Sequence, residues 1–209
     1  MNLLPDKECD FCPRLRGFIL HNRTAHPGFY NGPVPSFGSL DAEFLVVGLA
    51  PGLKGANQTG RPFTGDYAGI ILYNALLKHG FAKGDYKERA DDGLQLINCR
   101  ITNAVRCVPP ENKPEPNEIK RCNNFLQNEI AAMPNLKVIL SLGLVSHGAV
   151  LKATGHKAGF AKFEHGATAR LQNGLTLVDS YHCSRYNINT GRLTAAMFDV
   201  VMEKIRQLL

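Results

Sequence analysis

Short apolar runs that alternate with helical patterns are the feature that most constrains the fold of this chain. Four runs have the length and the β-branched, apolar character of buried strands, at residues 43–49, 94–102, 136–142 and 175–181. Helical repeats follow them, at about residues 66–80, 116–133, 143–154 and 191–209. This alternation predicts a three-layer α/β/α fold with a mostly parallel central sheet of about four strands. A chain of 209 residues can bury one sizeable core, so we expect a single domain over residues 1–209.

An unusual loop follows three of these predicted strands. The first strand runs into "APGLKGANQTGRPFTGD", the second into "NAVRCVPPENKPEPNE" and the fourth into "HCSRYNINTGR". Glycine and proline prevent the first two loops from continuing as strands. In parallel α/β sheets, ligands bind beyond the carboxyl ends of the strands. We therefore expect these three loops to converge on one crevice.

The charge balance favours a polyanionic partner such as nucleic acid. The chain has 24 Lys and Arg against 18 Asp and Glu, a net charge of +6. No run approaches the roughly 20 apolar residues that a membrane helix needs, so we expect no membrane association. The amino end lacks the basic and apolar stretches of a secretory signal, which predicts an intracellular, cytoplasmic protein. No G-x-S-x-G segment is present, and the sequence therefore does not favour an esterase-like hydrolase.

Four of the six cysteines have spacings that suit a metal site. Cys9 and Cys12 form a C-x2-C pair, and Cys107 and Cys122 form a C-x14-C pair. Four thiolates suit both zinc and a 4Fe–4S cluster, and the spacing leaves these two and a metal-free arrangement open. A metal bound here would have a structural role, because it would tie the amino-terminal segment to the 107–122 loop. The other two cysteines are expected to be small buried residues.

Four segments, taken together with these cysteines, resemble one family. The segments are "GLAPG" (residues 48–52), "GRPFTGD" (60–66), "TNAVRCVPPENKP" (102–114) and "YHCSRYN" (181–187). Their order and the cysteine pattern are similar to those of the iron–sulfur uracil-DNA glycosylases. The fifth family, or type b, is most similar, with the fourth family next. The resemblance implies a 4Fe–4S cluster in preference to zinc, and it implies DNA containing uracil as the partner.

Three positions distinguish this chain within that resemblance. The fourth family has an acidic residue where this chain has Leu49, which points to the fifth family and removes the usual residue for orienting the attacking water. Asn103 occupies the position of the fourth family's base-reading asparagine. Cys183 stands where proline or valine is more familiar in the family.

The resemblance and the demands of base excision assign roles around a base pocket. A base taken out of the DNA stack needs a flat apolar surface, which Phe63 would provide; the alternative is that Phe63 plugs the core under its loop. Asn103 would read the base edge through its amide, unless it only ends its strand. Asn112 is a second amide expected nearby. The pocket wall would come from the "GLAPG" turn, that is from Gly48, Leu49, Ala50, Pro51 and Gly52.

Cleavage of the N-glycosidic bond leaves negative charge on the base and positive charge on the sugar. His182 is expected to stabilise the departing base by donating to its carbonyl oxygen. Two roles are open to Asp66, one of them as the N-cap of the helix that follows it. The other is to orient the attacking water or to balance the cationic sugar, a role that Leu49 leaves vacant. Asp66, His182 and Asn103 are thus the predicted catalytic residues.

The same side of the sheet is expected to contact DNA. A phosphate-binding rim would come from the basic side chains of Lys54, Arg61, Arg106, Lys113, Arg185 and Arg192. The loop after the fourth strand would approach or wedge into the duplex through Ser184, Arg185, Tyr186 and Asn187.

These observations predict a monomeric DNA repair glycosylase that acts in base excision repair. It would hydrolyse the N-glycosidic bond of uracil, and of other deaminated or damaged bases that its pocket admits, to leave an abasic site. In a prokaryote it would be associated with the nucleoid. The alternative is a non-catalytic, metal-stabilised module that recognises damaged or abasic DNA.

Overall fold

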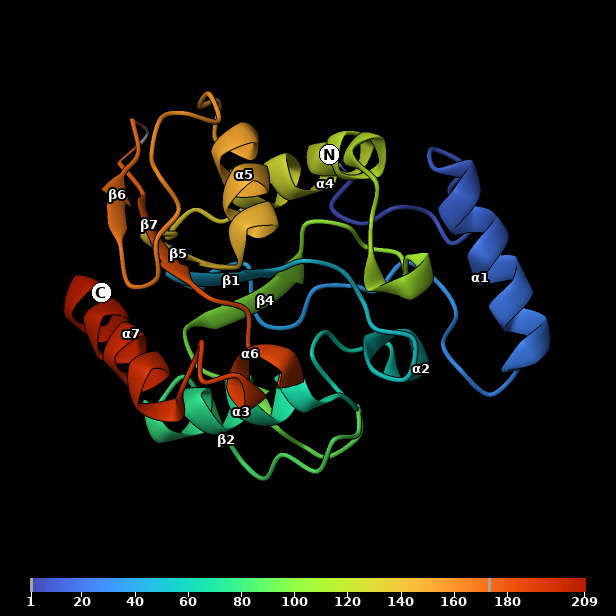
Figure 1. Cartoon of the computed structure of the whole chain (residues 1–209), viewed down its shortest axis with the longest axis horizontal. Coiled ribbons are helices and arrows are strands. Elements are labelled where there is room, and N and C mark those ends of the chain that lie inside the picture. Colours follow the sequence, from blue (N-terminus) through green and yellow to red (C-terminus); the bar gives the residue numbers. More distant parts are fainter. Residues whose placement is uncertain (1, 173) are drawn as a thin grey trace.

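A mostly parallel sheet forms the centre of the computed structural model, which describes residues 2–172 and 174–209. Five strands lie in the order β4-β1-β5-β7-β6 (Figure 1). Their bounds are β1 (Phe44–Gly48), β4 (Cys99–Asn103), β5 (Val138–Leu142), β6 (Thr168–Arg170) and β7 (Thr176–Ser180). The neighbouring strands β4, β1, β5 and β7 pair in parallel, while β6 pairs antiparallel with β7. The predicted α/β fold is confirmed, with one strand more than expected.

The sequence misplaced two parts of the sheet. The short edge strand β6 was missed because its three residues are half-buried or exposed and carry no apolar run. The run at 94–102 is not one strand: β3 (Gln95–Leu96) pairs antiparallel with β2 (Ala82–Lys83) in a separate small sheet, and β4 begins only at Cys99. Asn98 breaks the run with a left-handed φ of 48°, and its side chain bonds the backbone N–H and the carboxylate of Glu43.

Helices cover both faces of the sheet because successive side chains of the central strands point to opposite faces. Phe44 and Val46 of β1 pack in the core beneath α3 (Tyr67–Lys78) and α7 (Ala195–Leu208). Leu45 and Val47 pack in the core beneath α4 (Pro116–Ala131) and α5 (Leu144–Ala153). Figure 1 shows these two helix pairs on opposite sides of the sheet.

The helix boundaries follow local capping. Asp66 is the N-cap of α3 and accepts a hydrogen bond from the backbone N–H of Gly69, as the sequence predicted. The carboxyl-terminal helix starts later than predicted, because Thr194 caps α7 by accepting from the N–H of Met197. A separate short helix, α6 (Arg185–Asn189), lies in the preceding loop. Two further short elements are α2 (Ala56–Thr59) and the 3₁₀ turn η1 (Pro110–Asn112).

The amino-terminal segment forms a helix that the sequence analysis did not predict. Helix α1 (Pro13–Ala25) begins with proline at its first position, directly after Cys12. Its Leu15 packs in a small core with Val105 and Phe125. The segment is thereby attached to the exit of β4 and to α4.

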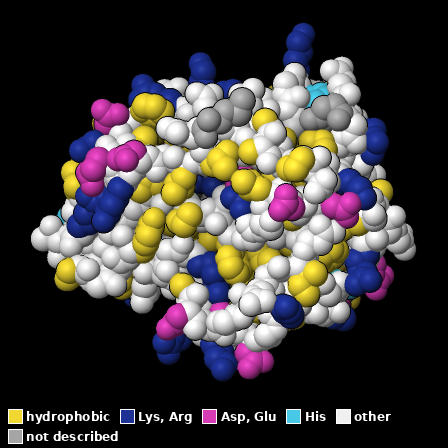
Figure 2. All heavy atoms as spheres, turned by 180° about the vertical axis from the view of Figure 1, so that it is seen from behind, with side chains coloured by type: hydrophobic (Ala, Val, Ile, Leu, Met, Phe, Trp, Pro, Cys, Tyr) yellow, Lys and Arg dark blue, Asp and Glu magenta, His cyan; other side chains and the backbone are white. Residues whose placement is uncertain are grey.

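None of the helices in the described part of the chain is long and apolar enough to cross a bilayer. Figure 2 shows the molecule from behind, with acidic and basic side chains intermixed around the outline of that face. The net charge of +6 is therefore not gathered into one large basic patch on the face drawn there.

Candidate active site

The loops that follow β1, β4 and β7 meet at one pocket, as expected from the positions of the strand ends. The pocket has a volume of about 540 Å³, within the range of small-ligand sites. Most of the predicted site residues line it, namely Leu49, Ala50, Gly52, Lys54, Phe63, Asp66, Asn103, Asn112, His182, Ser184 and Arg185. Gly48 and Pro51 are buried behind this lining.

Phe63 forms one wall of the pocket and is held in an uncommon backbone conformation. Its φ is 53°, in the left-handed region, and only 6% of the residue is exposed. The ring lies against the end of β1, where a Cβ on Gly48 would come within 2.4 Å of the ring and 2.3 Å of Oδ1 of Asn103. Only glycine at this position leaves room for both side chains.

Two amides face the pocket. Asn103 is the last residue of β4 and is 3% exposed. No hydrogen bond to the side-chain amide of either residue is found among residues 2–172 and 174–209; Asn112 is exposed, and the Asn103 amide is not among the fully buried polar groups left without a partner there. Both residues line the pocket, so their amides are free to bond a ligand bound there. The arrangement fits a planar base with alternating donors and acceptors at its edge.

Asp66 lies where its carboxylate can serve both as a helix cap and as a pocket group. Oδ1 accepts from the N–H of Gly69 at 2.9 Å. Oδ2 is oriented toward the turn after β1, since a Cβ on Gly52 would lie 3.5 Å from it. Burial raises the pKa of Asp66 above its usual value, and hydrogen bonds from the N–H groups of Gly69 and Ala68 partly oppose that rise.

His182 follows β7 and lies beside Phe63 in the pocket, with 6.1 Å between the ring centroids and 30° between the ring planes. Burial lowers the pKa of His182 to about 4, so the imidazole is neutral at neutral pH. Its backbone carbonyl accepts from Nδ2 of Asn187 at 2.9 Å, which holds the start of the loop. A neutral imidazole in this position can donate one N–H to a bound base.

The rest of that loop presents polar and aromatic groups beside the pocket. Ser184 caps α6 by accepting from the N–H of Asn187. The exposed guanidinium of Arg185 lies 5.1 Å from the ring centroid of Tyr67, and Tyr186 is 71% exposed. Arg192 is exposed and lies 4.7 Å from the ring centroid of Tyr181. These side chains are accessible to a large ligand.

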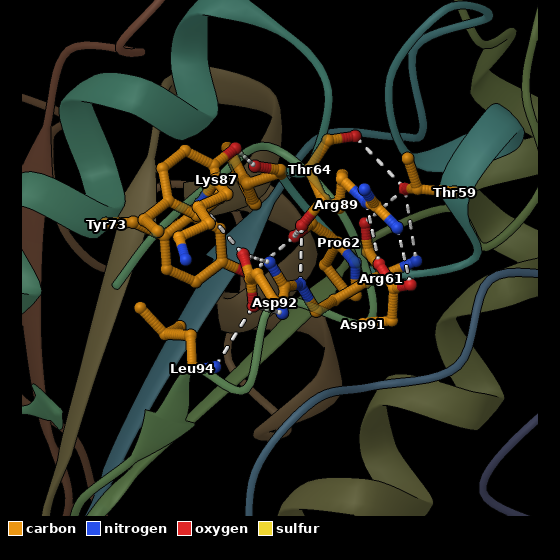
Figure 3. Close-up of polar contacts among 12 residues, drawn as sticks. Thr59, Arg61, Pro62, Thr64, Tyr73, Lys87, Arg89, Asp91, Asp92 and Leu94 are labelled. Atoms are coloured by element: carbon orange, nitrogen blue, oxygen red, sulfur yellow. Dashed lines mark hydrogen bonds and ion pairs between the residues drawn. The ribbon is translucent and has the colours of Figure 1, made fainter. Parts of the chain in front are cut away.

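Two of the basic residues predicted to bind phosphates do not lie on the surface. Arg61 is 5% exposed, and its guanidinium forms two hydrogen bonds of 2.7 Å with the carboxylate of Asp92 (Figure 3). Arg106 is 1% exposed and pairs with Glu129. A buried guanidinium with a carboxylate partner is not available to DNA, so the prediction for both residues is wrong. Of the other predicted rim residues, Lys113 is exposed, and its Nζ lies 3.8 Å from a carboxylate oxygen of Glu111.

Comparison with known proteins agrees with this geometry. A model of the uracil DNA glycosylase superfamily matches residues 35–206. The chain is 41% identical over 204 residues to a type-5 uracil-DNA glycosylase of Thermus thermophilus, covering 95% of this chain and 93% of the relative. The chain belongs to the uracil DNA glycosylase superfamily.

Two relatives from Pyrobaculum aerophilum show where the chain stands within the superfamily. It is 37% identical to a type-5 uracil-DNA glycosylase, over 94% of this chain and 87% of the relative. It is 32% identical to a type-4 uracil-DNA glycosylase, over 73% of this chain and 64% of the relative. The resemblance to the fifth family, with the fourth next, is confirmed.

The four cysteines of this superfamily member line one narrow cavity beside α1. Cys9, Cys12, Cys107 and Cys122 share it with apolar side chains such as Phe125. Burial, followed by the neighbouring Cys122, raises the pKa of Cys12 to about 11, and burial raises the pKa of Cys107 still further. In the described ranges, no three His, Cys, Asp or Glu side chains converge as a formed metal-ligand set. Thiols gathered from distant segments of the chain nevertheless have the donor chemistry of a zinc or iron–sulfur site.

The sequence analysis missed several residues that line the pocket: Leu53, Gly55, Ala56, Tyr67 and Ala68. Gly55 is the most constrained of these, because a Cβ there would lie 2.5 Å from Oδ2 of Asp66. The sequence signal for Gly55 was its position as the second glycine, after Gly52, in the loop that follows β1. Tyr67 directly follows the capping aspartate, and nothing in its local sequence distinguishes it from a core residue of α3.

Proposed function

We propose that this protein is a uracil-DNA glycosylase of the fifth type, which hydrolyses the N-glycosidic bond of uracil in DNA and leaves an abasic site. The observation that carries the proposal is the pocket itself. A cavity in a chain that belongs to the uracil DNA glycosylase superfamily is lined by the Phe63 ring, the amides of Asn103 and Asn112, the half-buried carboxylate of Asp66 and the neutral imidazole of His182.

The chemistry of base excision matches these groups. Phe63 would stack on the flipped base, and stacking of this kind is worth about 1–3 kcal/mol per base. Asn103 would bond the base edge, with Asn112 as a second amide. His182 would donate to the base carbonyl on which negative charge develops. The base therefore departs from a site that stabilises its anion.

Asp66 is the group proposed to act on the sugar side. Its Oδ2 is directed toward the pocket while Oδ1 caps α3, so both roles can be met at once. The ionised carboxylate would orient the attacking water and balance the positive charge on the sugar. Leu49 cannot do either, because its side chain has no polar atom.

Contacts to the DNA backbone would come from the exposed side chains beside the pocket. Arg185 and Lys54 line its mouth, and Ser184, Tyr186 and Arg192 extend the same surface. Asn187 would act from within, through its bond to the carbonyl of His182. Arg61 and Arg106 take no part, because both are buried in ion pairs.

The four cysteines are proposed to hold a 4Fe–4S cluster, with zinc as the alternative. Their shared cavity and the resemblance to the iron–sulfur families support this. The group would supply no reaction step; its residues would fasten α1 to the exit of β4, where Arg106 donates its backbone N–H to Sγ of Cys122 at 3.4 Å. Freshly purified protein that is brown would support the cluster, and colourless protein with stoichiometric zinc would contradict it. We further propose a single-domain monomer that works in the cytoplasm, at the nucleoid of a prokaryote.

A uracil-containing oligonucleotide tests the function directly. Incubation with the protein followed by alkali should break the strand at the former uracil, while the same oligonucleotide with thymine at that position should stay intact. Leu49 favours a second candidate, a non-catalytic module that binds damaged or abasic DNA. Tight binding without any alkali-sensitive site would support that candidate and overturn the glycosylase proposal. A panel of deaminated bases then defines the substrate range.

A further inference from the structure

The left-handed backbone of Phe63 requires support from its surroundings. A bulky aromatic residue rarely adopts a φ of 53°, and such a conformation persists only where neighbouring groups hold it. Tyr86 donates its hydroxyl proton to the carbonyl oxygen of Phe63 at 3.0 Å. Tyr73 donates to the carbonyl oxygen of Pro62 at 2.7 Å. Two consecutive carbonyl groups are therefore held by side chains that lie outside the pocket.

An ion pair fastens the same loop to the segment that carries Tyr86. Asp92 binds both terminal nitrogens of Arg61, and the Nε of Arg61 donates to Oγ1 of Thr64 at 2.8 Å (Figure 3). The Asp92 carboxylate also accepts from the backbone N–H groups of Lys87 and Leu94. Arg61 before Phe63 and Thr64 after it are thus linked to Asp92, and through Asp92 to residues 87–94.

We call Arg61, Tyr73, Tyr86 and Asp92 the clamp, and its ion pair is shielded from solvent. The Arg61 side chain is 6% exposed and that of Asp92 is not exposed at all. The guanidinium lies between 5.1 and 5.8 Å from the ring centroids of Phe37, Tyr73 and Tyr86, and the two tyrosine rings stack at 4.5 Å. The Arg61 guanidinium holds the pKa of Asp92 well below its usual range, so the carboxylate stays ionised. None of these side chains lines the pocket, so they cannot touch a bound base.

We propose that Tyr86 and Asp92 are positioning residues for base excision, acting through the backbone of Phe63. This inference rests on the proposed function. The hydroxyl of Tyr86 and the Asp92–Arg61 pair keep Phe63 left-handed, and only in that conformation does its ring form the pocket wall. A ring placed before the base arrives needs no rearrangement during the reaction.

The test measures single-turnover excision of uracil at saturating protein for Tyr86→Phe and Asp92→Asn. Tyr86→Phe keeps the ring stack on Tyr73 and removes only the hydroxyl that binds Phe63. Each variant should excise uracil at least about fivefold more slowly, because small displacements of a positioning group have effects of this size or larger. The affinity for abasic product DNA should stay within about twofold of the parent value, since the phosphate contacts lie elsewhere.

A double-mutant cycle with Phe63→Ala shows whether the effect passes through Phe63. In the Phe63→Ala background, the additional loss from Tyr86→Phe should shrink to less than about twofold, because coupled residues are not additive. Asp91→Asn is the matched control: Asp91 is an exposed neighbour that pairs with Arg89, and its loss should leave the rate unchanged.

Three results would decide against the inference. A lower melting temperature with an unchanged rate for the folded Tyr86→Phe variant would mean that the clamp only stabilises the fold. Full additivity with Phe63→Ala would mean that Tyr86 acts by another route. If Asp92→Asn does not fold, the Tyr86→Phe cycle decides alone. A parent protein that leaves uracil DNA intact would overturn the proposed function and this inference with it.

Discussion

Replacement of Asp66 by asparagine separates the two roles that the structure allows for this residue. Asparagine caps a helix about as well as aspartate, and its Oδ1 can still accept from the N–H of Gly69, a bond of 2.9 Å in the structure. The second carboxylate oxygen becomes an NH2 group, which cannot accept a proton or a hydrogen bond from water. The change therefore removes the charge that faces the pocket and keeps the cap.

The size of the expected effect follows from the bond that is lost. A hydrogen bond to a charged group contributes about 1.5–3 kcal/mol. If that contribution is made to the attacking water in the transition state, its loss lowers the rate by about 10- to 150-fold, at 1.4 kcal/mol for each factor of ten. The affinity for uracil DNA should change little, because Phe63, Asn103 and Arg185 are untouched.

Stability should not fall with the rate. The pKa of Asp66 is higher in the folded protein than in the unfolded chain, so the native state loses stability as the pH rises through that window. Asparagine has no such penalty at neutral pH, and we expect a melting temperature equal to or slightly above that of the parent. Thr194→Asn at the N-cap of α7 is the matched control, since it exchanges a cap away from the pocket.

The assay is single-turnover cleavage of a uracil oligonucleotide, read as alkali-sensitive strand breaks over a range of pH. The parent rate should fall as the pH is lowered through the raised pKa of Asp66, because only the ionised carboxylate can orient water. An Asp66→Asn variant that cleaves as fast as the parent would refute the catalytic role. Asp66 would then be only a cap, and another group would have to hold the water.

Three further predictions concern the DNA surface, the cysteines and the histidine. Arg185→Ala should weaken binding to duplex DNA, and the slope of log binding constant against log salt concentration should become shallower by about 0.9 per lost phosphate contact. The control Arg61→Lys should lower the melting temperature and leave that slope unchanged, because Arg61 is buried in an ion pair. Cys107→Ala should abolish the visible absorbance of a cluster and lower the melting temperature, while the folded fraction keeps most of its excision rate. A stable, colourless and fully active variant would contradict this. The parent excision rate should show no inflection near pH 6.5, where an ordinary histidine titrates, because the pKa of His182 is lowered to about 4. An inflection near pH 6.5 that disappears in His182→Gln would contradict the neutral imidazole.

The stability of the parent should also depend on His182 in a defined direction. Its folded pKa lies below the unfolded value, so the stability it contributes is present above about pH 6.5 and is lost as the pH falls toward 4. His182→Gln should therefore show a smaller loss of melting temperature over that acid range. An identical loss in both proteins, measured by thermal unfolding, would show that His182 is not the residue that titrates.

The sequence by itself determined the parallel sheet and the place of the site. Apolar runs alternating with helical repeats leave few arrangements other than a sheet covered on both faces, and polar loops after parallel strands must meet at one edge. Capping was equally local: the hydrogen bond from Gly69 to Asp66 depends on residues three positions apart. The break at Asn98 was not visible locally, because its side chain bonds Glu43, 55 positions away. The short strand β6 was missed because its three residues carry no apolar run.

Only the tertiary structure decided which charged residues are available to a ligand. Arg61 lies within a loop motif and Arg185 within another, and both are basic residues near glycine or polar neighbours. Arg61 is buried and pairs with Asp92, 31 positions along the chain, whereas Arg185 lies against the ring of Tyr67 and stays exposed. Whether a charged side chain is buried and paired depends on which distant segments pack together. The same packing holds Phe63 in its left-handed backbone conformation. A local sequence pattern can therefore place a basic residue beside a site without showing whether it is buried in an ion pair or exposed to a ligand.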